Sequence, residues 1–311
     1  MSDTLDTLPP DPMYDRRAQI RALTAASLKR RSRSSNVFMW AISSSLLIAL
    51  VPLVLVLFTV VSHGGSDLNY AFFTKLPQVP MIGLQNNIGG IGNAIIGTLI
   101  VAGMAAVMAI PLSLMLGLYL TEMQTRLSRA LRAAIEILAG VPSILLGVLA
   151  YIFIVIPEHH FSAFAASVAL ALLMTPVITK SVETSIQGVA SSVVEAGLAL
   201  GARQWTVARR VVLPGARPGI LTGTLLALAR AMGETAPLLL IIGATFSTSW
   251  DKNPFKPMSA LPTLTYYYSG SAYPSQHVAA WGVALVLVLL VLLLNLTSRF
   301  ISARLSRKAQ G

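Results

Sequence analysis

The chain contains long stretches without any lysine, arginine, aspartate or glutamate. Four of them cover residues 76–121, 137–157, 159–179 and 257–298. About 20 apolar residues are enough to cross the hydrocarbon core of a bilayer as a helix. Only 11% of the residues are charged, against about 25% in a soluble domain. We therefore expect an all-α, polytopic membrane protein embedded in a lipid bilayer.

The apolar stretches divide into about six candidate spans. They lie near residues 37–62, 90–120, 133–156, 161–180, 218–248 and 277–300. The segments 63–89 and 249–276 are rich in Gly, Pro, Asn, Ser and Tyr, so we expect loops there, with room for short interfacial helices. In the second loop, Tyr266, Tyr267 and Tyr268 suit the aromatic belt found at membrane interfaces.

The 23 lysine and arginine residues are distributed unevenly between the two sides of this topology. With six spans, 19 of them lie on the side of both termini, 3 lie on the other side, and Arg230 lies inside a span. Cytoplasmic loops are enriched in Lys and Arg. Both termini and the loop 181–217 are therefore expected in the cytoplasm, and the net charge of +11 reflects topology, with no nucleic-acid partner.

The same topology gives the domain organisation. Residues 1–36 form a basic cytoplasmic tail, residues 37–300 the transmembrane domain, and residues 301–311 a second cytoplasmic tail. The first tail begins with acidic residues and prolines, and its composition predicts disorder up to about residue 25.

Several kinds of chemistry lack the residues that they need. The chain has no cysteine, which excludes disulfides and thiolate metal sites. It also has no G-x-x-x-x-G-K-[ST] loop for ATP. An intramembrane enzyme would need a catalytic set, and the spans offer one Arg–Glu pair, no aspartate, and histidines only at their edges. We therefore expect no enzyme, no catalytic residue, no metal site and no cofactor.

The most unusual residue within a span is Arg230. It lies twelve residues after Pro218, which is about 18 Å along a helix and near the middle of a core about 30 Å thick. An arginine at this depth costs on the order of 3 kcal/mol and usually faces an interior path with a partner. Glu234 lies four residues on, hence on the same helix face, and Pro237 should kink the helix because it cannot donate to the carbonyl of Gly233.

Two interpretations of the pair remain open. It is either part of an anion pathway with a counter-ion or a neutralised pair that only holds helices together. Pro142, which should free the carbonyl of Leu138, and Ser143 leave a similar choice. They form either a polar patch or hinge on the pathway, or a helix-packing kink in which the serine hydroxyl bonds to its own backbone. Gly219 and Gly223 form a G-x-x-x-G face, which favours helix packing.

The polar interval before the fifth span contains a spaced motif. It reads Glu195-Ala196-Gly197, then Gly201, then, after nine further residues, Val211-Val212-Leu213-Pro214. This pattern resembles the EAA loop of ABC-importer permeases, with Gly197 in place of an alanine and Val211 in place of an isoleucine. The resemblance implies a type I ABC-importer permease fold. It also implies that residues Glu195 to Pro214 form a coupling helix on a cytoplasmic ATPase, which binds the ATP and its magnesium.

From the residues alone, Glu195 has a second interpretation. An acidic residue near the start of a helix is favourable to the helix dipole. Glu195 is then only a helix starter, and the basic residues around it only reflect topology.

Two further segments resemble phosphate-importer permeases. The sequence ARAMGETAPL, from Ala229 to Leu238, resembles A-R-x-x-G-E-T-A-P-L of that family, and its T-A-P-L ending resembles the A-type permease. LAGVPSI, from Leu138 to Ile144, resembles a second family segment. The likeness extends from about residue 90 to residue 300 and implies that Arg230 and Glu234 lie on the phosphate route. Thr235 and Ser143 are further candidates for that route.

The resemblance also implies an assembly in a bacterial inner membrane. Its members are a second, C-type permease, two copies of a cytoplasmic ATPase, and an extracytoplasmic phosphate-binding protein that supplies inorganic phosphate. One alternative is a permease for another oxyanion, such as molybdate or sulfate. Another is an ATP-independent anion channel, which leaves the EAA pattern unexplained.

Overall fold

The computed structural model describes residues 12–78, 89–243, 249–250 and 252–310. The start of the first tail, the end of the second, the end of the fifth predicted span and parts of the two predicted extracytoplasmic loops, 63–89 and 249–276, lie outside the described residues. Within the described residues the chain is helical nearly throughout. These residues contain two isolated β-bridges and no extended β-strand. The expected all-α class is confirmed. The chain separates into two units, Met1–Thr59 and Val60–Gly311.

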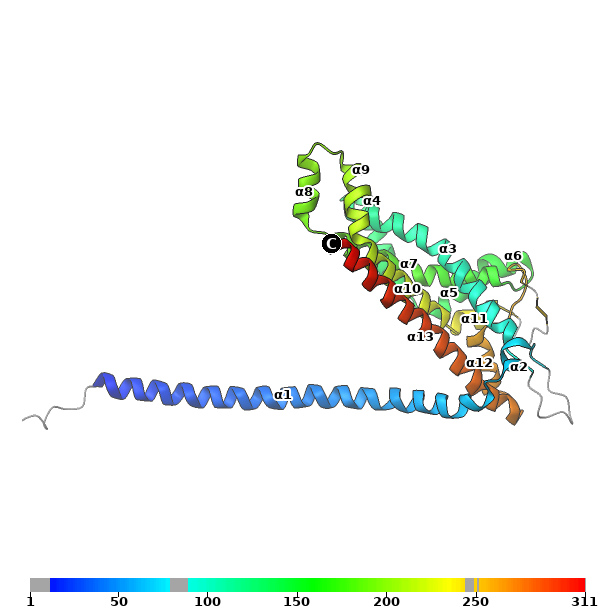
Figure 1. Cartoon of the computed structure of the whole chain (residues 1–311), viewed down its shortest axis with the longest axis horizontal. Coiled ribbons are helices and arrows are strands. Elements are labelled where there is room, and N and C mark those ends of the chain that lie inside the picture. Colours follow the sequence, from blue (N-terminus) through cyan, green and yellow to red (C-terminus); the bar gives the residue numbers. More distant parts are fainter. Residues whose placement is uncertain (1–11, 79–88, 244–248, 251, 311) are drawn as a thin grey trace, which may run out of the picture. The chain divides into compact units, whose positions relative to one another are not determined.

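Helix α1 runs from Pro12 to Gly64, and the first unit contains its residues up to Thr59 (Figure 1). The predicted disorder up to about residue 25 is wrong from Pro12 onward, because the helix begins there. From Phe38 the helix is apolar enough to cross a membrane. Its side chains between Phe38 and Phe58 are exposed, which suits contact with lipid tails as apolar as the side chains themselves.

The second unit contains the remaining elements (Figure 1). In chain order they are η1 Gly65–Asp67, α2 Tyr70–Thr74, α3 Gly92–Glu122, α4 Arg126–Gly140, α5 Ser143–Ala150, η2 Tyr151–Val155, α6 Ile156–Glu158, α7 Ala163–Gln187, α8 Ser191–Ala199, α9 Gln204–Val207, η3 Ala208–Val212, α10 Leu213–Met232, α11 Ala236–Ile241, α12 Leu261–Ser269 and α13 Pro274–Gln310. The elements η2 and η3 are π-helical turns.

Five described helices are long and apolar enough to cross a membrane. They are Phe38–Gly64, Gly92–Glu122, Ala163–Gln187, Gln204–Met232 and Pro274–Arg304. The predicted span 133–156 is different, because it consists of two helical segments, Arg126–Gly140 and Ser143–Glu158, that meet at an angle of 105°. Six spans result only if this bent pair counts as one.

Helix α7 is the centre of the core. It packs between α3 and α10 and is the most buried of the candidate spans. Its first turns present small buried residues, among them Ala163, Ala166 and Ala169. Helices in a membrane associate mainly through close packing, which small residues permit. The sequence of α7 therefore suits its central position.

The contact between α7 and α10 shows the same principle. A Cβ atom at Gly219 or Gly223 would overlap the side chain of Ser185 or Ser181, which lie opposite on α7. Ser181 Oγ also donates a hydrogen bond of 3.2 Å to the Gly219 carbonyl. This confirms the packing role predicted for the G-x-x-x-G face.

Helix α12 lies in a segment that was expected to be mainly loop. Its start is held by Thr98 of α3, whose hydroxyl accepts a 2.9 Å hydrogen bond from the Leu261 amide. Tyr268, which was assigned to an interfacial aromatic belt, is instead fully buried in the core. Burial raises the pKa of Tyr268 to about 12, because an apolar environment disfavours the charged phenolate.

Candidate functional site

Two of the predicted spans are broken in the middle, and the predicted pathway residues lie at the breaks. The first break separates α4 from α5. Val141 has an extended backbone, as expected for the residue before a proline, whose ring disfavours the helical conformation there. Pro142 follows as the N-cap of α5. The carbonyl of Leu138, predicted to be freed by Pro142, accepts a hydrogen bond of 3.3 Å from the Val141 amide.

The second break separates α10 from α11. Helix α10 ends at Met232, and α11 begins at Ala236. Pro237 occupies the first turn of α11, where its missing N–H has no cost. The prediction of one continuous helix kinked by Pro237 is therefore wrong, since the helix has already ended before Glu234.

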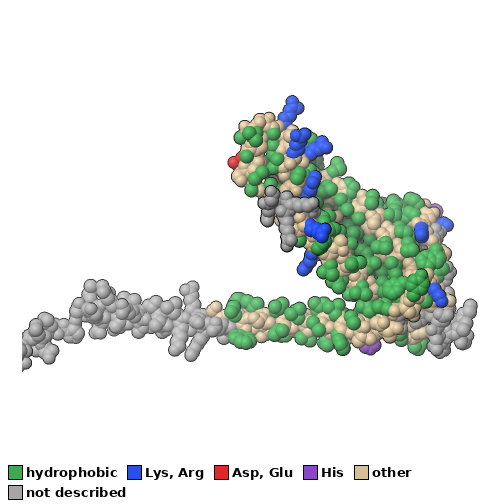
Figure 2. Space-filling view, viewed as in Figure 1, with side chains coloured by type: hydrophobic (Ala, Val, Ile, Leu, Met, Phe, Trp, Pro, Cys, Tyr) green, Lys and Arg blue, Asp and Glu red, His purple; other side chains and the backbone are tan. Residues whose placement is uncertain are grey.

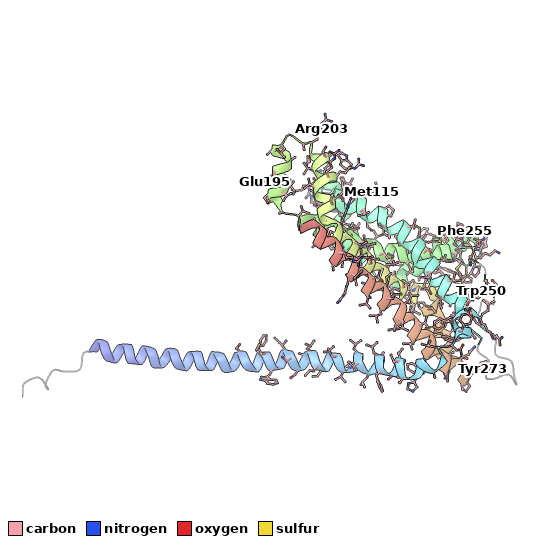
Figure 3. The ribbon with its side chains drawn as sticks, viewed as in Figure 1. Met115, Glu195, Arg203, Trp250, Phe255 and Tyr273 are labelled. Carbon is pink, nitrogen blue, oxygen red and sulfur yellow. The ribbon has the colours of Figure 1, made fainter. Side chains whose placement is uncertain are left out.

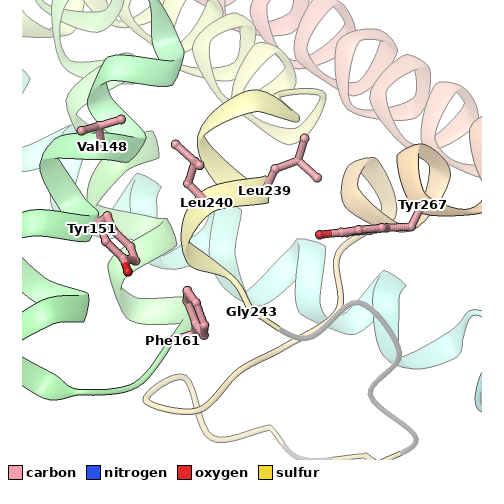
Figure 4. Close-up of a pocket in the computed structure, with 7 residues that line it drawn as sticks. All are labelled: Val148, Tyr151, Phe161, Leu239, Leu240, Gly243 and Tyr267. Atoms are coloured by element: carbon pink, nitrogen blue, oxygen red, sulfur yellow. The ribbon is translucent and has the colours of Figure 1, made fainter. Parts of the chain in front are cut away.

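The two short helices that follow the breaks lie side by side and run in the same direction. Gly147 of α5 packs directly on Pro237 of α11, and a Cβ at Gly147 would lie 2.7 Å from the Pro237 Cα. Further along, Val148 and Tyr151 face Leu240 across a shared cavity (Figure 4). The parallel arrangement places the two breaks at similar depth.

Arg230 lies just before the second break, and Glu234 lies within it. Arg230 is in the last turn of α10, a position that also favours a cation through the helix dipole. Its Nε atom lies 3.8 Å from Glu234 Oε1, and the Arg230 and Glu234 side chains are 62% and 19% exposed. Within the part of the chain that the structure describes, no other carboxylate lies within ion-pair distance of Arg230.

The geometry of the Arg230–Glu234 pair helps to decide between its two interpretations, an anion pathway and a pair that only holds helices together. Both residues belong to one short chain segment, so the pair does not join two helices of this chain. At 3.8 Å it is also longer than a hydrogen bond. A role restricted to locking helices together therefore has no support in this geometry, and most of the Arg230 side chain is accessible.

Ser143 and Thr235 take equivalent places at the two breaks. Ser143 is the first residue of α5 and is half-buried. Thr235 is the N-cap of α11, although its side chain accepts no capping hydrogen bond. Among the described residues, no hydrogen bond joins either side chain to Arg230 or Glu234. The structure therefore places Ser143 and Thr235 at the two breaks, without a described hydrogen bond from either side chain to the Arg230–Glu234 pair.

The predicted coupling segment forms helix α8 and a tight turn. Gly201 has a left-handed backbone, with φ of +79°. Its amide donates to the Leu198 carbonyl at 2.9 Å, and the Ala202 amide donates to the Gly197 carbonyl at 3.3 Å. These two bonds form a Schellman motif, in which glycine is strongly favoured. A Cβ at Gly201 would meet no described atom within 4 Å, so backbone conformation explains this glycine.

Glu195 and Ala196 lie on the exposed surface of α8. Four residues of the helix precede Glu195, which rules out the alternative of a helix starter. Gly197 faces the other way, and a Cβ there would lie 3.2 Å from Val207 Cγ2. This tight packing against α9 explains why Gly197 replaces the alanine of the EAA pattern.

Leu213 and Pro214 mark the start of α10 but not the start of the helix. The helix begins at Gln204 and continues through the π-turn η3 into α10 as one stretch of 29 residues. Pro214 lacks the N–H that would continue the regular pattern, and the π-turn lies directly before it. The helix that contains the predicted span therefore begins about four turns before residue 218.

Exposed apolar side chains surround the coupling segment. Val193, Leu198, Leu200 and Trp205 are all exposed, and sequence reasoning overlooked them because it treated the interval as polar. Their position between two spans was the one feature of the sequence that could have indicated an apolar docking surface. Together with Glu195 they form a mixed apolar and charged surface, which is typical of a protein interface.

The two ends of the second unit differ in chemistry. Glu195 and Arg203 lie at one end, and Trp250, Phe255 and Tyr273 lie at the other (Figure 3). Lys and Arg side chains gather near the first end (Figure 2), where Arg203 precedes α9, Arg209 and Arg210 lie in η3, and Arg217 lies near the start of α10.

A cavity of about 390 Å³ lies beside α5 and α11 (Figure 4). Its lining is Val148, Tyr151, Phe161, Leu239, Leu240, Gly243 and Tyr267. These residues include no charged group, so the cavity is poorly suited to hold an anion. Among the described residues there is also no group of three His, Asp or Glu side chains that could hold a metal ion.

Comparison with known proteins identifies the family. Residues 109–310 match the family described as binding-protein-dependent transport system inner membrane component. The chain is also 36% identical to the phosphate transport system permease protein PstA 1 of Mycobacterium tuberculosis, over 90% of this chain and 92% of that protein. The chain belongs to the PstA permease family. The PstA protein of Mycobacterium leprae is likewise 36% identical over 96% of this chain and 97% of its own length.

Solved structures confirm the type I importer permease fold of this PstA-family chain. The inward-facing MetNI methionine ABC transporter has a TM-score of 0.58 at 23% identity, over 68% of this chain and 94% of that chain. A bacterial alginate ABC transporter in complex with its periplasmic protein also has a TM-score of 0.58, at 13% identity, over 87% of this chain and 95% of that chain. The matched family region contains both breaks and the coupling segment.

Proposed function

We propose that this chain is the permease subunit of an ATP-driven importer of inorganic phosphate in a bacterial inner membrane. The proposal rests on one observation above others. An accessible arginine, Arg230, lies at a break between two helices of a predicted span, and its one carboxylate partner among the described residues, Glu234, is loosely held at 3.8 Å. An intramembrane ionisable residue of this kind marks a pathway by default.

The chemistry of the pair suits phosphate. Near neutral pH inorganic phosphate has one or two negative charges and retains at least one proton. The Arg230 guanidinium offers a planar set of donors to its oxygens, while the Glu234 carboxylate is able to accept the phosphate hydroxyl. Sulfate and molybdate lack that hydroxyl at neutral pH, so the pair favours phosphate over these oxyanions.

The two breaks make this chemistry possible inside the bilayer, toward its cytoplasmic side. Irregular backbone is tolerated inside a bilayer only where it lines a cavity or is covered by protein. Ser143 and Thr235 add hydroxyl groups at the same level as Arg230. We assign all four residues to the phosphate route between this chain and a second permease.

The coupling segment links the proposed route to ATP hydrolysis. The exposed surface of α8 docks on a cytoplasmic ATPase, which binds ATP and magnesium. From Gln204 a continuous helix leads to Met232, roughly 40 Å further along and next to Arg230. A displacement of α8 by the ATPases is therefore transmitted to the second break.

The full assembly contains a C-type permease, two copies of the ATPase and an extracytoplasmic phosphate-binding protein. Both termini and the coupling segment lie in the cytoplasm. Because the chain has no cysteine, a single cysteine at Ser191 tests this topology. An impermeant thiol reagent added to intact cells should leave it unlabelled, and labelling would contradict the orientation.

The decisive test is the ATPase activity of the purified complex in lipid vesicles. Phosphate together with its binding protein should stimulate hydrolysis, whereas molybdate or sulfate should not. Stimulation by another oxyanion alone would assign a different substrate. Phosphate flux in vesicles without ATP would instead support an ATP-independent anion channel.

A further inference from the structure

Helix α4 differs from the candidate spans in both composition and direction. It is much more strongly amphipathic than α3 or α7. It also meets the following segment, Ser143–Glu158, at an angle of 105°. If that segment is upright in the membrane, α4 lies nearly parallel to the membrane plane.

The length of the upright segment fixes the depth of the bend. Its 16 residues extend about 24 Å, compared with a hydrocarbon core about 30 Å thick. Glu158 and His159 at its far end are polar and belong at the outer edge of the core. The bend at Pro142 is then within about 6 Å of the cytoplasmic edge, which is close to the interface.

One side of α4 is held by the protein. Its inward-facing residues are Ser128, Leu131, Arg132, Ile135 and Leu138, which are buried or half-buried. Arg132 forms an ion pair of 2.8 Å with the buried Glu183 of α7 and donates to the Leu120 carbonyl of α3 at 3.2 Å. These contacts anchor α4 and determine which of its faces point outward.

The outward side of α4 divides into an apolar and a charged half. Successive residues are separated by about 100° around a helix, which places Leu127, Ala130, Ala134 and Ile137 on one half. Leu127 and Ile137 are 59% and 70% exposed. The other half contains Arg126, Arg129 and Glu136, all exposed. Within the described residues neither Arg126 nor Arg129 has an acidic partner.

We propose that α4 is an interfacial helix that binds anionic phospholipids of the cytoplasmic leaflet. Leu127 and Ile137 enter the upper acyl region, and Arg126 and Arg129 contact the lipid phosphate groups. A large amphipathic moment, arginines on the polar half and a direction in the membrane plane are together the features of such helices. Exposed basic residues at this depth attract anionic headgroups.

The depth of α4 is tested with spin labels in the assembled importer in nanodiscs. Single cysteines replace Ile137, Glu136 and, as a mid-span reference, the exposed Leu112 of α3. We expect the label at 137 to be accessible to oxygen but shallower than the label at 112. The label at 136 should be accessible to a water-soluble nickel reagent. Equal depth at 137 and 112 would show that α4 crosses the bilayer.

Two other outcomes would also contradict the proposal. A label at 137 that is shielded from both reagents would show that a partner subunit covers this face. A label at 137 that is as accessible to nickel as the label at 136 would place the helix in water.

The lipid contact is tested separately with Arg126→Gln/Arg129→Gln. Spin-labelled phosphatidylglycerol and phosphatidylcholine are compared for their association with the importer, and assembly is checked by co-purification of its subunits. The preference for phosphatidylglycerol should fall about two-fold or more in this variant. The control Lys75→Gln/Lys252→Gln removes the same charge elsewhere and should not change it. An unchanged preference in the α4 variant, or an equal loss in the control, would overturn the headgroup assignment.

Discussion

Gly147 and Pro237 are in backbone contact, although 90 residues separate them in the chain. A Cβ at Gly147 would lie 2.7 Å from the Pro237 Cα and 3.0 Å from its carbonyl oxygen. The contact holds together the two short helices that follow the breaks. It thereby sets the level of Ser143 relative to Glu234.

Substitution of Gly147 should disturb the pathway. In Gly147→Ala, α5 and α11 must move apart, because the methyl group meets backbone atoms that cannot rotate away. We expect a destabilisation of about 1 to 3 kcal/mol and a clear loss of phosphate uptake, measured by thermal unfolding of the complex and by uptake into vesicles.

Gly140→Ala is the matched control for Gly147→Ala. Gly140 lies at the other side of the same break, and a Cβ there would meet no described atom within 4 Å. Its uptake should equal that of the unsubstituted protein. Equal behaviour of both variants would mean that the contact with Pro237 has no role in transport.

Substitution of Gly201 should affect coupling. Its φ of +79° is unfavourable for other L-residues by about 1 to 2 kcal/mol, so Gly201→Val should distort the turn after α8. The variant should still insert into the membrane and lose both uptake and phosphate-stimulated ATPase activity. Gly201→Asn should retain more activity, since asparagine tolerates this conformation better.

A second glycine near the coupling segment provides the control for Gly201. Gly188 has a helical backbone, and its nearest neighbour would lie 3.4 Å from an added Cβ, which is an ordinary contact. Gly188→Ala should therefore transport normally. Normal uptake by Gly201→Val as well would contradict the role of the turn in coupling.

Of the two cations that pair with the buried carboxylate of Glu183, only Arg132 should contribute strongly to the stability of the fold. Arg132 lies at 2.8 Å and is 39% exposed, whereas Lys180 lies at 3.5 Å and is 68% exposed. Arg132→Met leaves a poorly compensated buried charge, which costs about 3 to 5 kcal/mol. Lys180→Met removes an exposed pair that is worth less than about 1 kcal/mol. Thermal unfolding of the two variants compares these costs, and equal destabilisation would refute the distinction.

Much of the fold follows from the sequence, but the breaks do not. Charge-free runs located the spans, because burial in lipid excludes charge along the whole length of a helix. The same apolar composition continues across Val141 and Pro142, so hydropathy gives no indication of a 105° bend there. A proline indicates a kink at most, and neighbouring helices decide its size.

The candidate site shows the same limit at single residues. The four-residue spacing correctly predicted that Arg230 and Glu234 lie near each other, although the helix thought to connect them ends at Met232. Tyr268 looked like its neighbours Tyr266 and Tyr267, yet it alone of the three is fully buried. Which face of a short helix turns inward depends on packing against α3 and α13, and these contacts are not visible in local sequence.

The two members of the charged pair should differ in importance. Arg230→Ala removes the main compensating charge for phosphate and should eliminate uptake. Glu234→Gln retains an acceptor for the phosphate hydroxyl and should weaken uptake less. Initial uptake rates at equal amounts of assembled complex compare the two, and the opposite ranking would rule out Arg230 as the primary anion-binding group.

The most direct test of the pathway is phosphate uptake by the double variant Arg230→Gln/Glu234→Gln in vesicles that contain the complete importer. The double substitution removes both charges together, so no charge is left unpaired in the membrane. We predict a complex that assembles with its ATPases and does not transport phosphate. Uptake at the rate of the unsubstituted importer would contradict the account and would show that the pair has only a structural role.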